Sequence, residues 1–265
     1  MKNSIPTALV FSGLDPSGGA GIQADIEALA SQGCHACPLI TTLTTQDTID
    51  VKSTVTVAPA LLLKQALCIL EDIPIAAVKI GLVDHTDTVA VIAEILGHLP
   101  HIPVILDPVL ASGADTELGN DDVHTAIRDL LLPLTTILTP NSKEARQLAP
   151  QADTLDACAM ALLDEGCEFV LITGTHEPTE KVSNTLYSNR RKLDTFNWPR
   201  LAGDYHGSGC TLASSITGLL AQGNEPLTAI HEAQEYTWQC LDKAYRIGKG
   251  QSIPNRLFWA ISDND

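Results

Sequence analysis

Short apolar strands alternate with amphipathic helices along most of this 265-residue chain. The strand candidates are brief apolar runs between turn residues, and the helix candidates repeat apolar residues at the spacing of one helical face. This alternation predicts an α/β fold, a three-layer sandwich in which helices cover both faces of a mostly parallel sheet. The expected strands are residues 8–12, 38–43, 76–80, 103–107, 136–139 and 169–173, and the expected helices are 22–31, 59–70, 86–99, 123–132, 143–148, 154–165, 211–221 and 226–245.

Two further segments, 182–188 and 192–198, read as an antiparallel hairpin turning at Asn189-Arg190-Arg191. They predict an antiparallel edge on the sheet. The sequence has no internal repeat and no low-complexity linker, so residues 1–265 are expected to form one domain. In such folds ligands bind beyond the carboxyl ends of the strands.

The amino-acid composition limits the kinds of molecule that this chain is expected to bind. The hydrophobic content of 45% suits a packed core, and a formal net charge of −16 argues against general nucleic-acid binding. No apolar run approaches the roughly 18–20 residues that a membrane span needs. Seven cysteines, an odd number lying in apolar segments, favour a reducing, cytoplasmic setting. The pair Cys34 and Cys37 has no second pair to complete a metal site, so core packing is the expected role.

A glycine-rich turn at residues 205–211 leads directly into a predicted helix. Free backbone N–H groups and the helix dipole at such a turn favour a phosphate or a developing negative charge. Cys210 lies in the first turn, where a thiol pKa tends to be lowered, so the cysteine is a candidate base for phosphoryl transfer to a hydroxyl. The alternative is a tight turn with a buried cysteine.

Residues 13–21 contain four glycines between a predicted strand and a predicted helix. The spacing matches neither a Walker A motif nor the dinucleotide fingerprint. A strand-to-helix connection that simply needs glycine would look the same. Two glycine-rich helix starts in one chain nevertheless favour a bipartite ligand site.

Acidic and amide side chains follow two predicted strands. Asp107 ends the run at 104–106, where a carboxylate can hold magnesium directly or through water. Asn141 and Glu144 follow the next strand and could join that site. They also have the spacing of a helix N-cap and its capping-box partner. Both interpretations can hold together.

The ordered set of motifs resembles the hydroxymethylpyrimidine/phosphomethylpyrimidine kinases of thiamine biosynthesis, members of the ribokinase-like superfamily. The resemblance rests on residues 12–25, 44–46, 78–81, 106–109, 139–145, 206–211 and 248–250, which occur in the family's order over nearly the whole chain. It implies a ribokinase-like kinase that uses ATP and Mg²⁺. Its substrates would be a hydroxymethylpyrimidine and then the monophosphate, and the enzyme would be a homodimer.

The resemblance also implies a role for each matching residue. Cys210 occupies the position where most ribokinase-like enzymes carry a catalytic Asp, and N–H groups of its neighbours would hold the phosphoryl group. Gln46 matches the family's pyrimidine-reading glutamine. The implied assignments are catalytic Cys210, Gly207, Ser208 and Gly209; substrate-binding Gly13, Asp25, Gln46, Leu82 and Val109; nucleotide-binding Asn141, Gly174 and Lys249; and metal-binding Asp107 and Glu144.

Several alternatives stay open. Without the resemblance, Gln46 would read as an exposed loop residue, Asp25 as part of a solvated helix face and Lys79 as a lysine whose amine reaches solvent at a strand end. Thr173 stands where the family usually has a lysine near the ATP phosphates, and the loop at 107–113 is shorter than usual. Thr173 favours one alternative, a non-catalytic pyrimidine-binding protein on the same fold. The enzyme alternative is a pyridoxal/pyridoxine kinase, since relatives phosphorylate a similar hydroxymethyl heteroaromatic.

Overall fold

The computed structural model describes residues 5–111 and 118–260, and its nine strands form one sheet in the order β3-β2-β1-β4-β5-β6-β7-β8-β9. The strands from β2 to β7 in this order are parallel, whereas β3, β8 and β9 pair antiparallel with their neighbours. The strands are β1 (Thr7–Leu14), β2 (His35–Gln46), β3 (Val51–Thr56), β4 (Ala77–Ile80), β5 (Val104–Leu106), β6 (Ile137–Leu138), β7 (Phe169–Ile172), β8 (Lys181–Ser188) and β9 (Arg191–Pro199).

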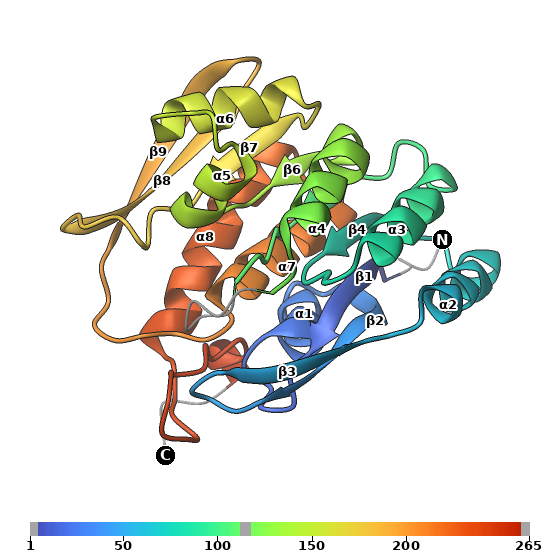
Figure 1. Ribbon diagram of the computed structural model, residues 1–265. Helices are drawn as coiled ribbons and strands as arrows, with labels where there is room; N and C mark the ends of the chain where they lie inside the picture. Colours follow the sequence, from blue (N-terminus) through green and yellow to red (C-terminus); the bar gives the residue numbers. More distant parts are fainter. Residues whose placement is uncertain (1–4, 112–117, 261–265) are drawn as a thin grey trace.

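Helices cover both faces of this sheet, as the alternation predicts (Figure 1). One layer contains α1 (Gly21–Ser31), α7 (Ser208–Ala221) and α8 (Pro226–Asp242). The other contains α2 (Pro59–Asp72), α3 (Thr86–Gly97), α4 (Asp121–Ala126), α5 (Ser142–Leu148) and α6 (Leu155–Asp164). Short turns of π-helix at Ile127–Leu131 and 3₁₀-helix at Leu132–Leu134 and Phe258–Ala260 complete the elements. The predicted three-layer α/β architecture is confirmed.

Alternate residues of one strand supply the cores on the two faces. On β5, Ile105 packs with α7 and α8, whereas Leu106 packs in the core beneath the other helix layer. Cys34 and Cys37 are divided between two of the buried clusters in the same way, and both are buried and free. Side chains three residues apart in extended backbone point to opposite faces of the sheet, which is why the two cysteines lie in different clusters. The expectation that they serve core packing is confirmed.

The hairpin prediction is confirmed, and one strand was missed. β8 and β9 turn at Asn189 and Arg190, both with positive φ, which suits a two-residue hairpin turn. β3 was not predicted because its residues are mostly polar and exposed, as on many edge strands. Its pairing extends β2 as far as Gln46, so this glutamine ends a strand instead of lying in a loop. The helix predicted at 123–132 is present as a continuous helical run, in which α4 gives way to a π-helical turn and then to the 3₁₀ turn that contains Pro133.

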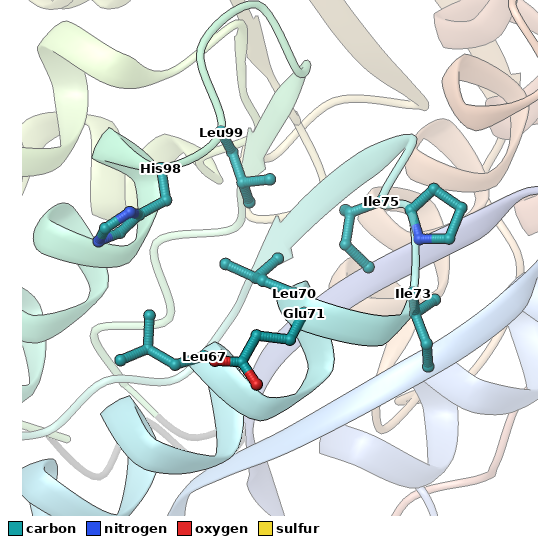
Figure 2. A pocket seen from close by; sticks show the side chains of 8 residues that line it. Leu67, Leu70, Glu71, Ile73, Ile75, His98 and Leu99 are labelled. Carbon is teal, nitrogen blue, oxygen red and sulfur yellow. The ribbon is translucent and has the colours of Figure 1, made fainter.

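A hollow lined by Leu67, Leu70, Ile73, Ile75 and Leu99, with Glu71 and His98 beside them, lies between the ends of α2 and α3 (Figure 2). It adjoins the start of β4, so it is at the opposite end of the sheet from the loops that follow the parallel strands. The shorter loop predicted at 107–113 extends into residues 112–117, which lie outside the described residues. Among the described helices, none is long and apolar enough to cross a membrane.

Candidate functional site

Two glycine-rich turns from opposite ends of the chain meet at the carboxyl ends of the parallel strands. One joins β1 to α1, and the other precedes α7. Gly207 has a left-handed backbone (φ 84°), and a Cβ atom there would lie 2.0 Å from the carbonyl oxygen of Gly19. A Cβ atom on Gly19 would lie 2.3 Å from Cδ2 of His206. Both positions require glycine because the two turns are in contact.

The first turn of α7 begins at Ser208, three residues earlier than periodicity predicts. Thr211 N–H donates to the carbonyl of Gly207 (2.9 Å), so the N–H groups before Thr211 have no partner within the helix. Asp107 lies next to this turn: a Cβ atom on Gly209 would be 3.5 Å from its Oδ1. The turn therefore has free donors and the positive end of a helix dipole, which an anion site needs.

Cys210 lies in this turn and is 8% exposed. Gly21 N–H donates to its sulfur, and the thiol hydrogen bonds with the side chain of Asp107. Burial raises the pKa of the Cys210 thiol to about 12; the charges of Asp107 and Asp25 also raise it, while the charge of Lys79 opposes the rise. The predicted lowering of this pKa is therefore wrong for the ligand-free protein, because burial among carboxylates outweighs the helix dipole.

Lys79 at the end of β4 is fully buried, so its amine does not reach solvent. Its Nζ lies 2.9 Å from Oδ1 of Asp25 and forms an ion pair with this carboxylate. Ser214 on α7 donates to the same oxygen (2.7 Å). Burial alone would lower the pKa of Lys79, but the charges of Asp25 and Asp107 raise it, so the ammonium stays charged. Asp25 is fully buried as well, and the solvated-face alternative for it is wrong.

Asp107 and Glu144 form a buried acidic pair between the ends of β5 and β6. Glu144 accepts N–H groups of Asn141 (2.8 Å) and Leu110, and Asn141 in turn caps α5, so the capping box is complete. Burial raises the pKa of Glu144 to about 8, and the charge of Asp107 adds to the rise. Burial likewise raises the pKa of Asp107 to about 6, although the charge of Lys79 acts to lower it. Oδ2 of Asp107 is buried without a hydrogen-bond partner.

A second polar cluster joins the β1–α1 turn to the end of β2. Asp15 accepts N–H groups of Ser17 (2.7 Å) and Ala20 (2.8 Å), which shapes the turn. Nε2 of His206 lies 2.8 Å from Oδ2 of Asp15 and 2.8 Å from the side-chain amide of Gln46. The structure thus connects Gln46 to both glycine-rich turns.

Asp15 and Gln46 are each held by several hydrogen bonds. Burial alone would raise the pKa of Asp15, but hydrogen bonds from His206, Ser17 and Ala20 lower it below its ordinary value. The amide nitrogen of Gln46 faces Nε2 of His206, and its oxygen accepts the hydroxyl of Thr44 (3.0 Å). The amide is thus fixed from both sides at the end of β2.

Gly13 and Leu82 lie together near this cluster. A Cβ atom on Gly13 would be 2.9 Å from a methyl carbon of Leu82. The hydroxyl of Thr41 donates a hydrogen bond to the carbonyl of Leu82 (2.6 Å). Val109 follows Asp107, whose carbonyl accepts its N–H (2.9 Å). These residues follow or end β1, β4 and β5, the strands against which α7 packs.

The expected nucleotide residues do not lie together. Gly174 follows β7 and donates its N–H to Asn184 (3.1 Å), and Thr173 beside it forms a bridge with Asn141. Lys249 is exposed in a segment that packs against the β2–β3 turn, several strands away in the sheet order. The structure therefore keeps Asn141 with Gly174 and separates Lys249 from them.

Sequence reasoning missed four members of the site. Lys79 stood out as a lysine within an apolar run, which is a usable signal of a buried charge. Asp15 precedes a proline in the glycine-rich turn, and His206 precedes the second such turn, but nothing in their spacing shows that they meet. Arg256, which contacts both turns, has no local sequence signal.

The sequence pattern of the phosphomethylpyrimidine kinase family matches residues 15–255. The chain is 36% identical over 257 residues to a hydroxymethylpyrimidine/phosphomethylpyrimidine kinase of Synechococcus elongatus, covering 94% of this chain and 96% of the relative. It is 32% identical to a bifunctional thiamine biosynthetic enzyme of Arabidopsis thaliana, and there it covers 97% of this chain but spans only 51% of the relative. The structure of an ADP complex of Bacillus subtilis pyridoxal kinase superposes with a TM-score of 0.89 at 26% identity, covering 98% of this chain and 100% of that one.

Replacing Glu144 should change how stability depends on pH. Its folded pKa of about 8 lies above the ordinary 4.5, so folding binds a proton, and the free energy of unfolding falls as pH rises between these values. Glu144→Gln keeps an acceptor for Asn141 and removes the charge. We expect the variant to lose less stability between about pH 5 and pH 8, by up to roughly 1.4 kcal/mol per unit of pKa shift.

Urea unfolding of the ligand-free proteins at both pH values measures this difference. Exposed Glu94 on α3 provides the control: Glu94→Gln should follow the wild type. Parallel curves for Glu144→Gln and the wild type would contradict the assignment.

Proposed function

The chain belongs to the phosphomethylpyrimidine kinase family, and from that premise we propose that it phosphorylates 4-amino-5-hydroxymethyl-2-methylpyrimidine with ATP. It would then phosphorylate the monophosphate to the diphosphate used in thiamine biosynthesis. One observation carries the proposal: the free N–H groups and Cys210 at the start of α7 lie beside Asp107, while His206 ties this turn to Gln46. The turn that would bind the phosphoryl group and the amide that would recognise the pyrimidine ring thus lie at the same edge of the sheet.

The acidic pair fits a magnesium ion. Mg²⁺ prefers oxygen ligands and is usually held by one or two carboxylates together with substrate phosphates and water. Asp107 presents a buried oxygen without a partner, and Glu144 lies beside it. When bound there, Mg²⁺ would neutralise charge on the ATP phosphates. Asp107 and Glu144 would hold the ion, and its charge would also favour the ionised state of both side chains.

Cys210 is placed to accept the proton of the substrate hydroxymethyl group. Its thiol is protonated in the ligand-free protein, because burial raises its pKa to about 12. Acceptance of a substrate proton therefore requires the thiol to release its own proton to solvent first, and the charge of buried Lys79 favours the resulting thiolate. Free N–H groups of the same helical turn would hold the transferred phosphoryl group.

Gln46 supplies the pyrimidine-reading group. Its oxygen has a second lone pair and its NH₂ a second hydrogen after the contacts with His206 and Thr44 are made. One amide can therefore pair with both a ring nitrogen and an exocyclic amine of an aminopyrimidine. The nucleotide would lie on the other side of the α7 start, near Asn141 and Gly174.

A coupled assay of ADP release with the hydroxymethylpyrimidine, its monophosphate and pyridoxal tests the function. We expect the highest kcat/KM with the hydroxymethylpyrimidine. Faster turnover of pyridoxal would favour the vitamin B6 kinase, and pyrimidine binding without ADP release would favour a non-catalytic protein. The monophosphate arm decides whether the second step survives with Thr173 in place of the family lysine.

Cys210→Ser should reduce kcat by on the order of 10²-fold or more, the range for loss of a general base. Substrate affinity should change little, because the N–H groups of the turn remain. Cys68, an exposed cysteine on α2, provides the matched control, and Cys68→Ser should keep wild-type turnover. Normal turnover in the Cys210 variant would remove this residue from the mechanism.

Gln46→Ala should raise KM for the pyrimidine while leaving ATP affinity nearly unchanged. The loss of hydrogen bonds to a bound ligand is worth roughly 0.5–1.5 kcal/mol each, so the weakening should be about tenfold. Titration calorimetry with each ligand measures the two affinities separately, and Gln151→Ala, at an exposed position, is the control. An equal loss of both affinities would mean that Gln46 supports the fold instead.

The exposed face of the β2–β3 hairpin supports the proposed homodimer. Leu43 and Val55 are directly paired across the hairpin and are 42% and 63% exposed. Val55→Asp should convert the dimer to a monomer in sedimentation velocity, because a charge on this apolar pair opposes its burial. Leu227→Asp, at an exposed position on α8, should leave the dimer intact. A monomeric wild type would contradict the proposal.

A further inference from the structure

Arg256 has the largest fully buried side chain among the described residues, at 1% exposure. Its guanidinium group contacts three different segments. Nε donates to the hydroxyl of Thr211 (2.9 Å), and one terminal nitrogen lies 3.1 Å from the carboxylate of Glu27 on α1. The other terminal nitrogen donates to the carbonyl of Gly19. One side chain from the end of the chain is thus inserted beneath both glycine-rich turns.

These contacts lie where the two turns meet. Thr211 belongs to the first turn of α7, and its hydroxyl donates to the carbonyl of Gly207 (2.8 Å). Gly207 and Gly19 are in backbone contact, and a Cβ atom on Gly207 would also lie 2.9 Å from the Arg256 guanidinium. Arg256 therefore sets the distance between the turn that begins α7 and the turn that begins α1.

The rest of the same segment holds the third part of the site. We call residues 250–256 the C-terminal strap; it lies beside the β2–β3 turn in Figure 1. Gly250 and Gln251 donate their N–H groups to the hydroxyl (3.0 Å) and carbonyl (2.8 Å) of Thr48, two residues after Gln46. Ser252 accepts the N–H of His206 (2.9 Å). The strap thus contacts the α7 turn, the β1–α1 turn and the turn that follows Gln46.

Stability alone is a weak reason to bury this guanidinium. Removing a charge from water is costly, and buried ion pairs can often be replaced by apolar residues without loss of stability. The partner carboxylate of Glu27 is also only partly buried, with 26% of its side chain exposed. What an arginine supplies and an apolar side chain does not is a rigid planar fork with donors in several directions.

We propose that Arg256 is a positioning residue for phosphoryl transfer, holding the phosphoryl-binding turn of α7 and the substrate side of the site in register. This inference rests on the proposed kinase function. Phosphoryl transfer depends on the placement of acceptor and phosphoryl groups, and a misplacement of about 1 Å can cost on the order of 10²-fold in rate. Arg256 touches neither substrate nor nucleotide in this proposal; it acts through the backbones of Gly19 and Gly207.

Two variants of Arg256 test the role by steady-state kinetics and thermal melting. Arg256→Lys keeps the charge but cannot reach three partners at once, and Arg256→Ala removes the group. We expect kcat to fall by about 10–100-fold in both. KM for ATP should change less than threefold, because the strap does not contact Asn141 or Gly174. Added methylguanidinium should restore several-fold of the lost kcat in Arg256→Ala, measured against sodium chloride at equal ionic strength.

Tyr236→Phe is the matched structural control. The hydroxyl of Tyr236 donates to the backbone carbonyl of Arg256 (2.7 Å), so its loss destabilises the strap and leaves the guanidinium contacts in place. We expect a lower melting temperature, a kcat within about threefold of the wild type and no response to methylguanidinium. Folded Arg256 variants with wild-type kcat, or a loss of kcat that Tyr236→Phe reproduces at equal stability, would overturn the proposal.

A second pair of variants covers the case in which the Arg256 variants do not fold. Thr211→Val removes the hydroxyl that links Arg256 to Gly207, and Thr211→Ser keeps it. The serine variant should recover most of the kcat that the valine variant loses. Equal kcat in the two folded variants would overturn the proposal. An inactive wild type would contradict the kinase function itself, which separates that failure from failure of the role given to Arg256.

Discussion

The buried ion pair of Lys79 and Asp25 is the interaction on which the site depends. Neither side chain is exposed, so each charge needs the other to offset the cost of leaving water. Lys79 comes from the central strand β4 and Asp25 from α1, while Ser214 on α7 donates to the same carboxylate. The pair therefore fixes α1 and α7 on the sheet, beneath the point where the glycine-rich turns before these two helices meet. Removing either charge would leave the other buried without a partner.

The charges around this pair explain how an acidic protein can handle phosphates. Asp25 and Asp107 are buried around the charged amine of Lys79, and Glu144 is buried beside Asp107. Burial raises the pKa of Asp107 and Glu144 toward neutrality, so in the ligand-free protein part of this excess negative charge is removed by bound protons. A divalent cation would stabilise the ionised carboxylates and attract the phosphates together. The N–H groups of the α7 turn then provide anion binding without adding another side-chain charge.

Much of the fold was predictable because it depends on local periodicity. The alternation of strands and helices, the β8–β9 hairpin and the starts of most helices follow from residue patterns within short windows. Asp107, Asn141 and Gly13 were also expected at one edge, since the carboxyl ends of parallel strands share it. Edge strand β3 was missed because its pattern is polar and its partner strand alone decides its conformation. The Cys210 pKa was misjudged because the helix dipole is local, whereas burial is set by distant segments.

The sequence by itself determined the α/β class, the two glycine-rich helix starts and the candidates Cys210, Gln46 and Asp107. Only the tertiary structure decided which of them meet. It placed His206 between Asp15 and Gln46, separated Lys249 from Gly174 and inserted Arg256 between turns that lie almost two hundred residues apart along the chain. The physical reason is that hydrogen bonds, desolvation and charge pairing depend on distance in space. Residues remote in sequence therefore determine the protonation and orientation of a site whose residue types are already visible in the chain.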